Sequence, residues 1–182
     1  MLWRGASAPP MVRNVMTAVT ALPATNRSTA GLVLAGSIAA LAVAFASQYI
    51  GGLLPCQLCL WQRWGYAGAI ALAIVALLLP RHLRGPGALL ASLAVLATAG
   101  ISLFHTGVEY HWWQGLPSCS GTLDTSQSIS NLEQQLLATP VIPCDKPAWT
   151  MFGVSMAGYD FLYATALGLF CLTGAIPSMR RG

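Results

Sequence analysis

Apolar residues in this 182-residue chain are concentrated in four long runs that polar segments separate. A membrane-spanning helix needs about 20 mostly apolar residues. Four stretches qualify: about 30–50, 64–79 (extended by Leu60 and Trp61), 88–108 and 152–176. Because only residues 80–86 separate the second and third runs, those two helices should form a tight antiparallel hairpin. The pattern predicts an all-α membrane protein, a bundle of four transmembrane helices.

The composition supports this prediction and indicates one domain. Hydrophobic residues make up 55% of the chain and charged residues 8%, whereas a soluble domain carries about 25% charged residues. The net charge is +4, but the nine Lys and Arg residues form no patch interleaved with aromatic side chains. We therefore expect a lipid bilayer as the environment and no nucleic-acid partner.

Basic residues indicate how the helices are oriented. Seven of the nine lie in segments that four crossings place on one side: Arg4, Arg13, Arg27, Arg81, Arg84, Arg180 and Arg181. Because Lys and Arg accumulate in cytoplasmic segments, we expect both termini in the cytoplasm. The expected organisation is a tail over 1–29, a transmembrane domain over 30–177 with outer loops at about 51–63 and 109–151, and a second tail over 178–182.

A cleaved secretory signal is an alternative for the first apolar run, because Ala44-Phe45-Ala46 resembles a cleavage site. The apolar stretch before it has about 15 residues, which is the upper limit for such a signal. Cleavage would also remove one crossing, so we favour an uncleaved first helix. Met11 and Met16 leave the start codon open.

Cys56 and Cys59 form a C-x-x-C motif at the start of the second run. A thiolate is the nucleophile in disulfide exchange, and the positive end of a helix dipole favours its formation. Pro55 directly precedes the pair, as proline often does near a helix start. Arg63 lies four residues after Cys59 and therefore on the same helical face. This pattern predicts a redox-active pair at the membrane boundary, with a cation one turn away.

Two simpler interpretations of these residues compete with the redox one. A C-x-x-C motif can be half of a zinc site, and His105 and His111 are available as ligands. A second close pair of cysteines is missing, so we favour no metal. Arg63 considered alone is most simply an interfacial anchor of its helix.

Cys119 and Cys144 lie in the long outer loop, each beside proline and other turn-forming residues. Cysteines outside a bacterial inner membrane are in an oxidising compartment, so they tend to be paired or redox-active. A structural staple is the simplest interpretation, but an exposed, mobile disulfide together with the C-x-x-C motif indicates a relay. Between the two cysteines, residues 123–138 predict a short amphipathic helix lying on the membrane surface. Cys171, inside an apolar run, is expected to pack as a small hydrophobe.

His105 and Glu109 lie at the outer end of the third run and share one helical face. Such a histidine is often only a packing residue, but an imidazole changes charge near neutral pH and so suits proton delivery. Asp160 lies inside the fourth run. Ionisable residues at membrane depth are costly, so Asp160 is a functional candidate.

The chain resembles the bacterial disulfide bond formation protein B family. The stretch around the first pair is similar to the P-C-x-L-C-x-x-Q-R signature of that family: Pro55-Cys56-Gln57-Leu58-Cys59 followed by Gln62-Arg63. Cys119 and Cys144 stand where the family has its second pair, and segments 105–110 and 149–158 are also similar. The resemblance covers about 31–176. At Asp160 the chain departs from the neutral Asn that is common in the family.

This resemblance implies an enzyme of the bacterial inner membrane, with both cysteine pairs in the periplasm. A reduced DsbA-like protein would attack the Cys119–Cys144 disulfide at Cys119. Electrons would pass to a Cys56–Cys59 disulfide, and Cys59 would transfer them to a quinone, ubiquinone or menaquinone.

The resemblance also suggests residues for the quinone site. Arg63 is expected close to the quinone. Gln62, His105 and Glu109 are further candidates for quinone binding.

Three other protein classes were weighed. A vitamin K epoxide reductase type also uses a membrane C-x-x-C motif, but late in the chain rather than first. A membrane scaffold would use its cysteines only as staples, with deeply reducing disulfides and no quinone reduction. A transporter is least favoured, because the chain shows no evident internal repeat and no paired broken spans.

Overall fold

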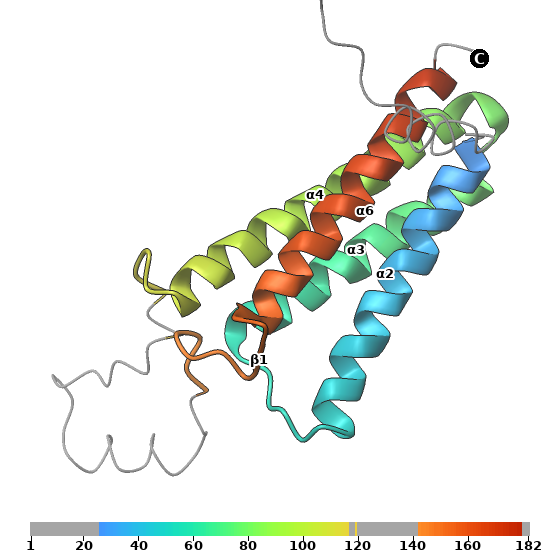
Figure 1. Cartoon of the computed structure of the whole chain (residues 1–182). Coiled ribbons are helices and arrows are strands. Elements are labelled where there is room, and N and C mark those ends of the chain that lie inside the picture. The colour runs from blue at the N-terminus through green and yellow to red at the C-terminus, as the bar shows by residue number, and fades with distance from the viewer. Residues whose placement is uncertain (1–25, 117–118, 120–141, 180–182) are drawn as a thin grey trace, which may run out of the picture.

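The computed structural model describes residues 26–116, 119 and 142–179. Its long helices form an antiparallel bundle in which α4 packs against α3 and α6, and α2 packs against α3 (Figure 1). Their bounds are α2 (Asn26–Tyr49), α3 (Gln57–Leu78), α4 (Arg81–Glu109) and α6 (Met156–Met179). All four are long and apolar enough to cross a membrane. The predicted all-α bundle of four membrane-spanning helices is therefore confirmed.

Three of the helices begin earlier than their apolar runs, and α2 does so by about four residues, at Asn26. Helix α3 begins at Gln57, directly after the first cysteine of the C-x-x-C motif, so the whole motif belongs to its first turn. Helix α4 begins at Arg81, with Pro80 as its N-cap. The expected loop over 80–86 is thus mostly helical, because proline is compatible with a helix start and the Arg84 Nε donates to the Leu79 carbonyl at 2.8 Å.

Helix α6 begins later than its apolar run, at Met156 instead of residue 152. The intervening residues form a two-stranded hairpin, β1 (Thr150–Met151) and β2 (Val154–Ser155). Its turn holds Phe152 at φ 52° and Gly153 at φ 77°, the left-handed conformation that two-residue hairpin turns require. The Tyr110 hydroxyl donates to the Gly153 carbonyl at 2.7 Å and ties this hairpin to the end of α4.

Small residues allow the helices to approach closely. The largest buried cluster contains Ala69 and Ala73 of α3, packed with Ala91, Val95 and Ala99 of α4. Without a hydrophobic driving force between helices in lipid, close packing of small residues is a main source of stability. The bundle is therefore held by backbone proximity more than by large side chains.

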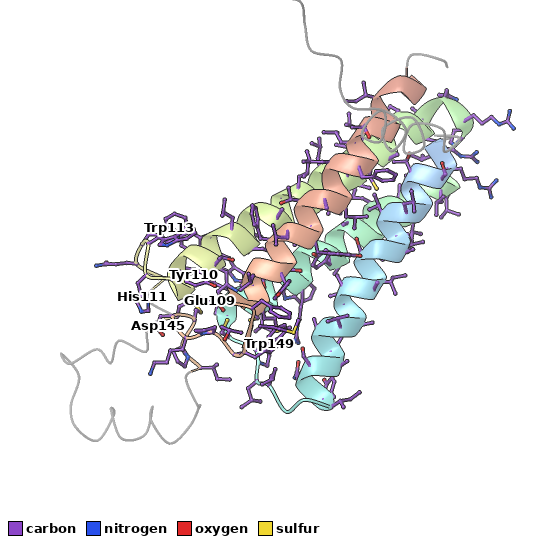
Figure 2. All side chains as sticks on the ribbon, in the orientation of Figure 1. Glu109, Tyr110, His111, Trp113, Asp145 and Trp149 are labelled. Carbon is purple, nitrogen blue, oxygen red and sulfur yellow. A yellow bond between two sulfur atoms is a disulfide. The ribbon has the colours of Figure 1, made fainter. Side chains whose placement is uncertain are left out.

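Both described cysteine segments lie at one end of the bundle. Figure 1 shows β1 and the start of α3 at the end opposite the end of α6 and the α3–α4 connection. Figure 2 shows Glu109, Tyr110 and Trp149 at this same end. The amphipathic helix predicted over 123–138 lies outside the described residues.

The closest approach of α3 to α4 is testable at Gly65. A Cβ placed there would come within 3.2 Å of the Thr98 Cβ and Cγ2 and closer still to its hydroxyl, so the helices would have to separate. We expect Gly65→Ala to destabilise the protein by about 1–3 kcal/mol through overpacking. The measurement is thermal unfolding of the purified protein in detergent.

Gly68 provides the matched control. It lies on the same helix, and a Cβ there meets nothing within 4 Å. Gly68→Ala should therefore leave the melting temperature unchanged or raise it, because alanine is the better helix former. Equal melting temperatures for the two variants would contradict the proposed close contact.

Candidate functional site

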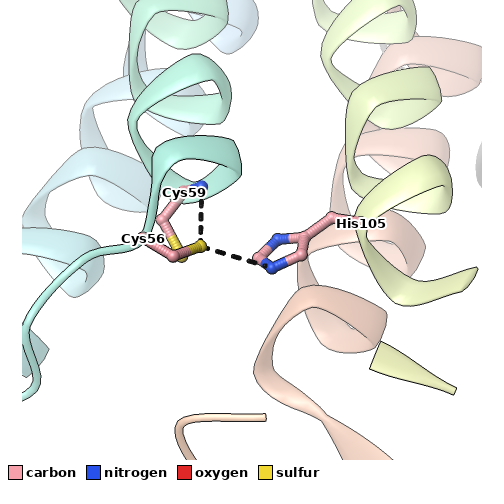
Figure 3. Close-up of side chains that lie close together, drawn as sticks. All are labelled: Cys56, Cys59 and His105. Atoms are coloured by element: carbon pink, nitrogen blue, oxygen red, sulfur yellow. Dashed lines mark hydrogen bonds between the residues drawn. The ribbon is translucent and has the colours of Figure 1, made fainter. Parts of the chain in front are cut away.

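The C-x-x-C motif forms the first turn of α3. Cys56 is the N-cap, with extended backbone, and its sulfur accepts a hydrogen bond from the Cys59 backbone N–H at 3.4 Å. This bond satisfies one of the backbone donors that a helix start leaves without an intrahelical partner. The two sulfur atoms are 3.1 Å apart and both thiols are free (Figure 3). The structure therefore holds the pair as a dithiol, about 1 Å from bonding distance.

His105 reaches this pair from α4. Its Nε2 lies 3.5 Å from the Cys56 sulfur, as Figure 3 shows. Hydrogen bonding by the Cys59 side chain is the main cause that lowers the pKa of Cys56 to about 4, against the opposing effect of burial, and His105 lowers it further. Cys56 is therefore a thiolate at neutral pH, the form that acts as nucleophile and as leaving group in disulfide exchange.

Cys119 and Cys144 form a disulfide, with their Cα atoms 4.9 Å apart. The Cys144 N–H also donates to the Cys119 carbonyl at 3.1 Å. The sequence predicted an exposed disulfide, and this was wrong: the two residues are 1% and 0% exposed. They are covered because they pack with Leu58 and Val108 from the ends of α3 and α4.

The disulfide and the dithiol share one buried cluster. Cys56, Cys119 and Cys144 belong to it, and Cys59 packs against it. Disulfide exchange requires one sulfur to reach another through a mixed disulfide. The packing brings the two predicted pairs into one place, although the second pair comes from a loop distant in sequence.

Glu109 lies one turn after His105 on α4, with its Oε1 3.7 Å from the His105 Nε2. Both side chains are almost fully buried, at 4% and 3% exposed. His105 Nδ1 and Glu109 Oε2 have no hydrogen-bond partner among the described residues. These two predicted residues thus join the dithiol and leave unpaired polar atoms beside it.

Arg63 points from α3 to α2 instead of to the thiols. Its guanidinium donates to the Gln48 side chain and, at 3.0 Å, to the Ala44 carbonyl. It also lies over the Phe45 ring, 5.0 Å from the centroid. Sequence reasoning missed Gln48, whose only signal is an amide in the last turn of an apolar run. Arg63 therefore connects the two helices as well as carrying a charge.

A cavity of about 720 Å³ extends from the dithiol into the bundle. Apolar side chains of α2, of α6 and of the segments 53–55 and 142–151 form most of its wall, and Cys56, Cys59 and His105 lie along it. Gln62 also lines it and is 8% exposed, and its side-chain nitrogen has no partner within the described part of the chain. An apolar cavity with a few polar groups is typical of a small-molecule site.

Asp160 lines the same cavity and is not left unpaired. Its carboxylate accepts hydrogen bonds from the Tyr66 hydroxyl at 2.8 Å and from the Ser102 hydroxyl at 2.5 Å. Polar groups from two helices, α3 and α4, thus satisfy the charged residue that the sequence singled out. Tyr66 follows Arg63 by three positions, so its place on the same helical face could have been found from the sequence.

The fold and the site define a class: a membrane bundle that carries a dithiol and a disulfide together at one end. Residues 26–174 match the family model described as "Disulfide bond formation protein DsbB". The chain belongs to this family.

Similar proteins agree with this assignment. The chain is 31% identical over 160 residues to Disulfide bond formation protein B of Marinobacter nauticus, covering 81% of this chain and 92% of that one. It is 30% identical over 162 residues to Disulfide bond formation protein B 2 of Pseudomonas aeruginosa, covering 82% and 88%. Uncharacterized protein RP370 of Rickettsia prowazekii is 32% identical over 136 residues, covering 74% and 78%. No solved structure matches the chain.

The low pKa of Cys56 can be tested by replacing Cys59, the residue that contributes most to it. Because hydrogen bonding by Cys59 is the largest cause of the shift, Cys59→Ala should raise the Cys56 pKa from about 4 toward the ordinary thiol value of about 8.5. The reduced protein with Cys59 intact should keep thiolate absorbance between about pH 5 and pH 8, whereas the variant should lose it as the pH falls.

Both titrations use a background in which Cys119 and Cys144 are replaced by serine and Cys171 by alanine. Cys56 and Cys59 are then the remaining cysteines of the background protein, and Cys56 is the remaining cysteine of the Cys59→Ala variant. A His105→Gln variant is expected to shift the midpoint in the same direction by a smaller amount, since His105 is a lesser cause. Identical titration curves for Cys59→Ala and the background protein would contradict the assignment.

Proposed function

We propose that this chain reoxidises a periplasmic DsbA-like dithiol protein by disulfide exchange and passes the electrons to a membrane quinone. The observation that supports this most directly is the packing of the Cys56–Cys59 dithiol and the Cys119–Cys144 disulfide in one buried cluster beside an apolar cavity. Membership of the disulfide bond formation family supports the same reaction class.

In the first step, a thiolate of the partner attacks Cys119 and Cys144 leaves, which gives a mixed disulfide. The second partner thiol then releases the partner as a disulfide and leaves Cys119 and Cys144 reduced. Because both sulfurs are buried, the segment that carries them must open before the partner can attack. Burial would protect the disulfide from thiols that do not make this contact.

In the second step, one thiolate of the reduced loop pair attacks Cys59 of a Cys56–Cys59 disulfide, and Cys56 leaves as a thiolate. The other loop thiol then displaces Cys59, which re-forms the Cys119–Cys144 disulfide and leaves Cys56 and Cys59 reduced. The environment that stabilises the Cys56 thiolate makes Cys56 a good leaving group. Its neighbour Cys59 already lies 3.1 Å away, so re-forming this disulfide needs little movement. We propose that Cys59 is the thiol from which the acceptor takes the electrons.

The cavity fits a quinone ring with part of its tail. A quinone, ubiquinone or menaquinone, would accept two electrons and two protons there as the two thiols become a disulfide. The unpaired Gln62 amide nitrogen is a donor for a carbonyl oxygen, and the Arg63 guanidinium contributes positive charge to the same wall. His105 and Glu109 are close enough to the dithiol to receive protons from it.

We propose an orientation in the bacterial inner membrane with both termini in the cytoplasm. Among the described residues, the basic side chains that support it are Arg27 at the start of α2, and Arg81 and Arg84 at the start of α4. Figure 1 shows these helix ends at the end of the bundle opposite β1 and the start of α3. Both cysteine pairs would then face the periplasm, where disulfides form and persist.

The relay is tested by Cys59→Ser. We expect this variant to lose quinone reduction, because no Cys56–Cys59 disulfide can form. It should still oxidise one equivalent of a reduced DsbA-like protein through the Cys119–Cys144 disulfide, and then stop. Stopped-flow absorbance of ubiquinone and menaquinone analogues measures the first effect, and non-reducing gel electrophoresis measures the second.

Cys171→Ala is the matched control for loss of a thiol. Cys171 lies in a separate buried cluster, so this variant should reduce quinone at the unmodified rate. If Cys59→Ser turned over reduced partner with quinone normally, the proposed function would be wrong.

Arg63 is tested by a change that removes the charge and keeps much of the volume. We expect Arg63→Met to raise the KM for quinone by about tenfold, equivalent to about 1.4 kcal/mol, with a smaller effect on kcat. Steady-state kinetics with a soluble quinone analogue gives the two constants separately.

The control is Gln48→Ala, which removes one Arg63 hydrogen bond and leaves both the charge and the bond to the Ala44 carbonyl. Its KM should stay within about twofold of the unmodified value. If Arg63 only anchors α3 to α2, both variants should lower the melting temperature and leave KM unchanged.

A further inference from the structure

We propose that the reduced form of this chain binds a thiophilic divalent cation such as Zn²⁺ at Cys56, Cys59 and His105, and that the bound cation prevents the disulfide from re-forming. The binding stands on the geometry of this site alone. The inhibition that follows from it rests on the proposed function.

The three ligand atoms are already gathered. The sulfur atoms of Cys56 and Cys59 and the His105 Nε2 all lie within 4.8 Å of one another. Zinc bond lengths of about 2.3 Å to sulfur and 2.0–2.1 Å to nitrogen place tetrahedral ligands roughly 3.5–3.8 Å apart. The distance from the Cys56 sulfur to Nε2 is 3.5 Å and the distance between the sulfurs is 3.1 Å. A small widening of the sulfur pair would therefore admit the ion.

The ligand chemistry also suits such a cation. Two sulfurs and an imidazole are the donor set that zinc prefers. His105 Nδ1 has no partner in the described part of the chain, which allows the tautomer that leaves Nε2 free to bind.

A fourth ligand is available nearby but is not in place. The Glu109 Oε1 lies 3.7 Å from the His105 Nε2, and carboxylate oxygen is a usual zinc ligand. The carboxylate lies outside the set of mutually close atoms, so the fourth position would be filled by water or by Glu109 after rotation. The cavity that borders all four residues gives the ion a path to the site.

Binding and oxidation exclude each other. The cation needs two thiolates, so it displaces the thiol protons that remain and balances two negative charges, with no transfer of electrons. In a Cys56–Cys59 disulfide the same sulfurs are bonded to each other and are much poorer ligands. Metal would therefore bind only the reduced enzyme and hold it there.

Cobalt is a suitable spectroscopic probe. The full-length protein is purified in detergent with Cys119 and Cys144 replaced by serine, which removes the other pair of possible ligands. The reduced protein should bind Co²⁺ at one equivalent with thiolate-to-cobalt absorption, which one equivalent of Zn²⁺ should abolish. The oxidised protein should show no such absorption.

Two histidine variants distinguish specific coordination at Cys56, Cys59 and His105 from nonspecific metal binding. We expect His105→Gln to weaken Co²⁺ binding by at least about tenfold, since even outer-shell changes cost 10–100-fold. His111→Gln is the matched control, because His111 is not among the gathered ligands, and it should bind as the parent does. Equal affinity of the two variants, or no thiolate-to-cobalt absorption in the reduced parent, would overturn the proposal.

A cysteine variant covers the case in which His105→Gln fails to fold. Cys59→Ser should lose thiolate-to-cobalt absorption, whereas Cys171→Ala should keep it. A Cys59→Ser protein that melts like the parent and binds Co²⁺ equally well would also overturn the proposal.

The activity measurement distinguishes failure of this inference from failure of the proposed function. In the protein with all its cysteines, Zn²⁺ should inhibit quinone reduction by reduced partner, and a chelator should restore it. Full activity in saturating Zn²⁺ would overturn the inhibition and leave the proposed function intact. Co²⁺ binding as expected without any quinone reduction in metal-free protein would sink the proposed function and support the metal site.

Discussion

The structure depends on where α3 begins. A helix in lipid must satisfy its backbone groups internally, and only its ends can leave donors for other partners. Here the Cys56 sulfur accepts one of these bonds, from the Cys59 N–H. The helix start and the redox pair are therefore one feature. This places two reactive sulfurs where a membrane cavity and the outer loops meet.

The geometry of the pair then depends on how closely α4 approaches α3. The contact of Gly65 with Thr98, and the alanines that continue it, bring α4 alongside α3. At the outer end of this interface His105 reaches the Cys56 sulfur. A larger residue in this interface would move the His105 imidazole away from the Cys56 thiolate. This would happen even though the substituted residue lies more than one helical turn from both His105 and Cys56. The packing of α3 against α4 therefore sets the distance between His105 and the Cys56 sulfur at the end of the bundle.

The sequence predicted those features that depend on neighbouring residues. Length and hydropathy were sufficient for the four spans, and spacing placed Cys56 and Cys59 on one helical turn. The contact between His105 and Cys56 joins residues 49 positions apart, and periodicity carries no information about it. Burial of the Cys119–Cys144 disulfide was missed because polar flanking residues suggest exposure, whereas packing against the helix ends decides it.

Asp160 and Arg63, two charged residues in the described part of the bundle, are held by hydrogen bonds between helices. Asp160 receives hydroxyls from Tyr66 and Ser102, and Arg63 donates to a side chain and a carbonyl of α2. An unpaired charge at membrane depth is costly, so these bonds make the two residues tolerable while fixing α2 and α6 to the central helices. They also place polar groups along one wall of an otherwise apolar cavity. Such a wall suits a ligand that has both apolar and polar parts.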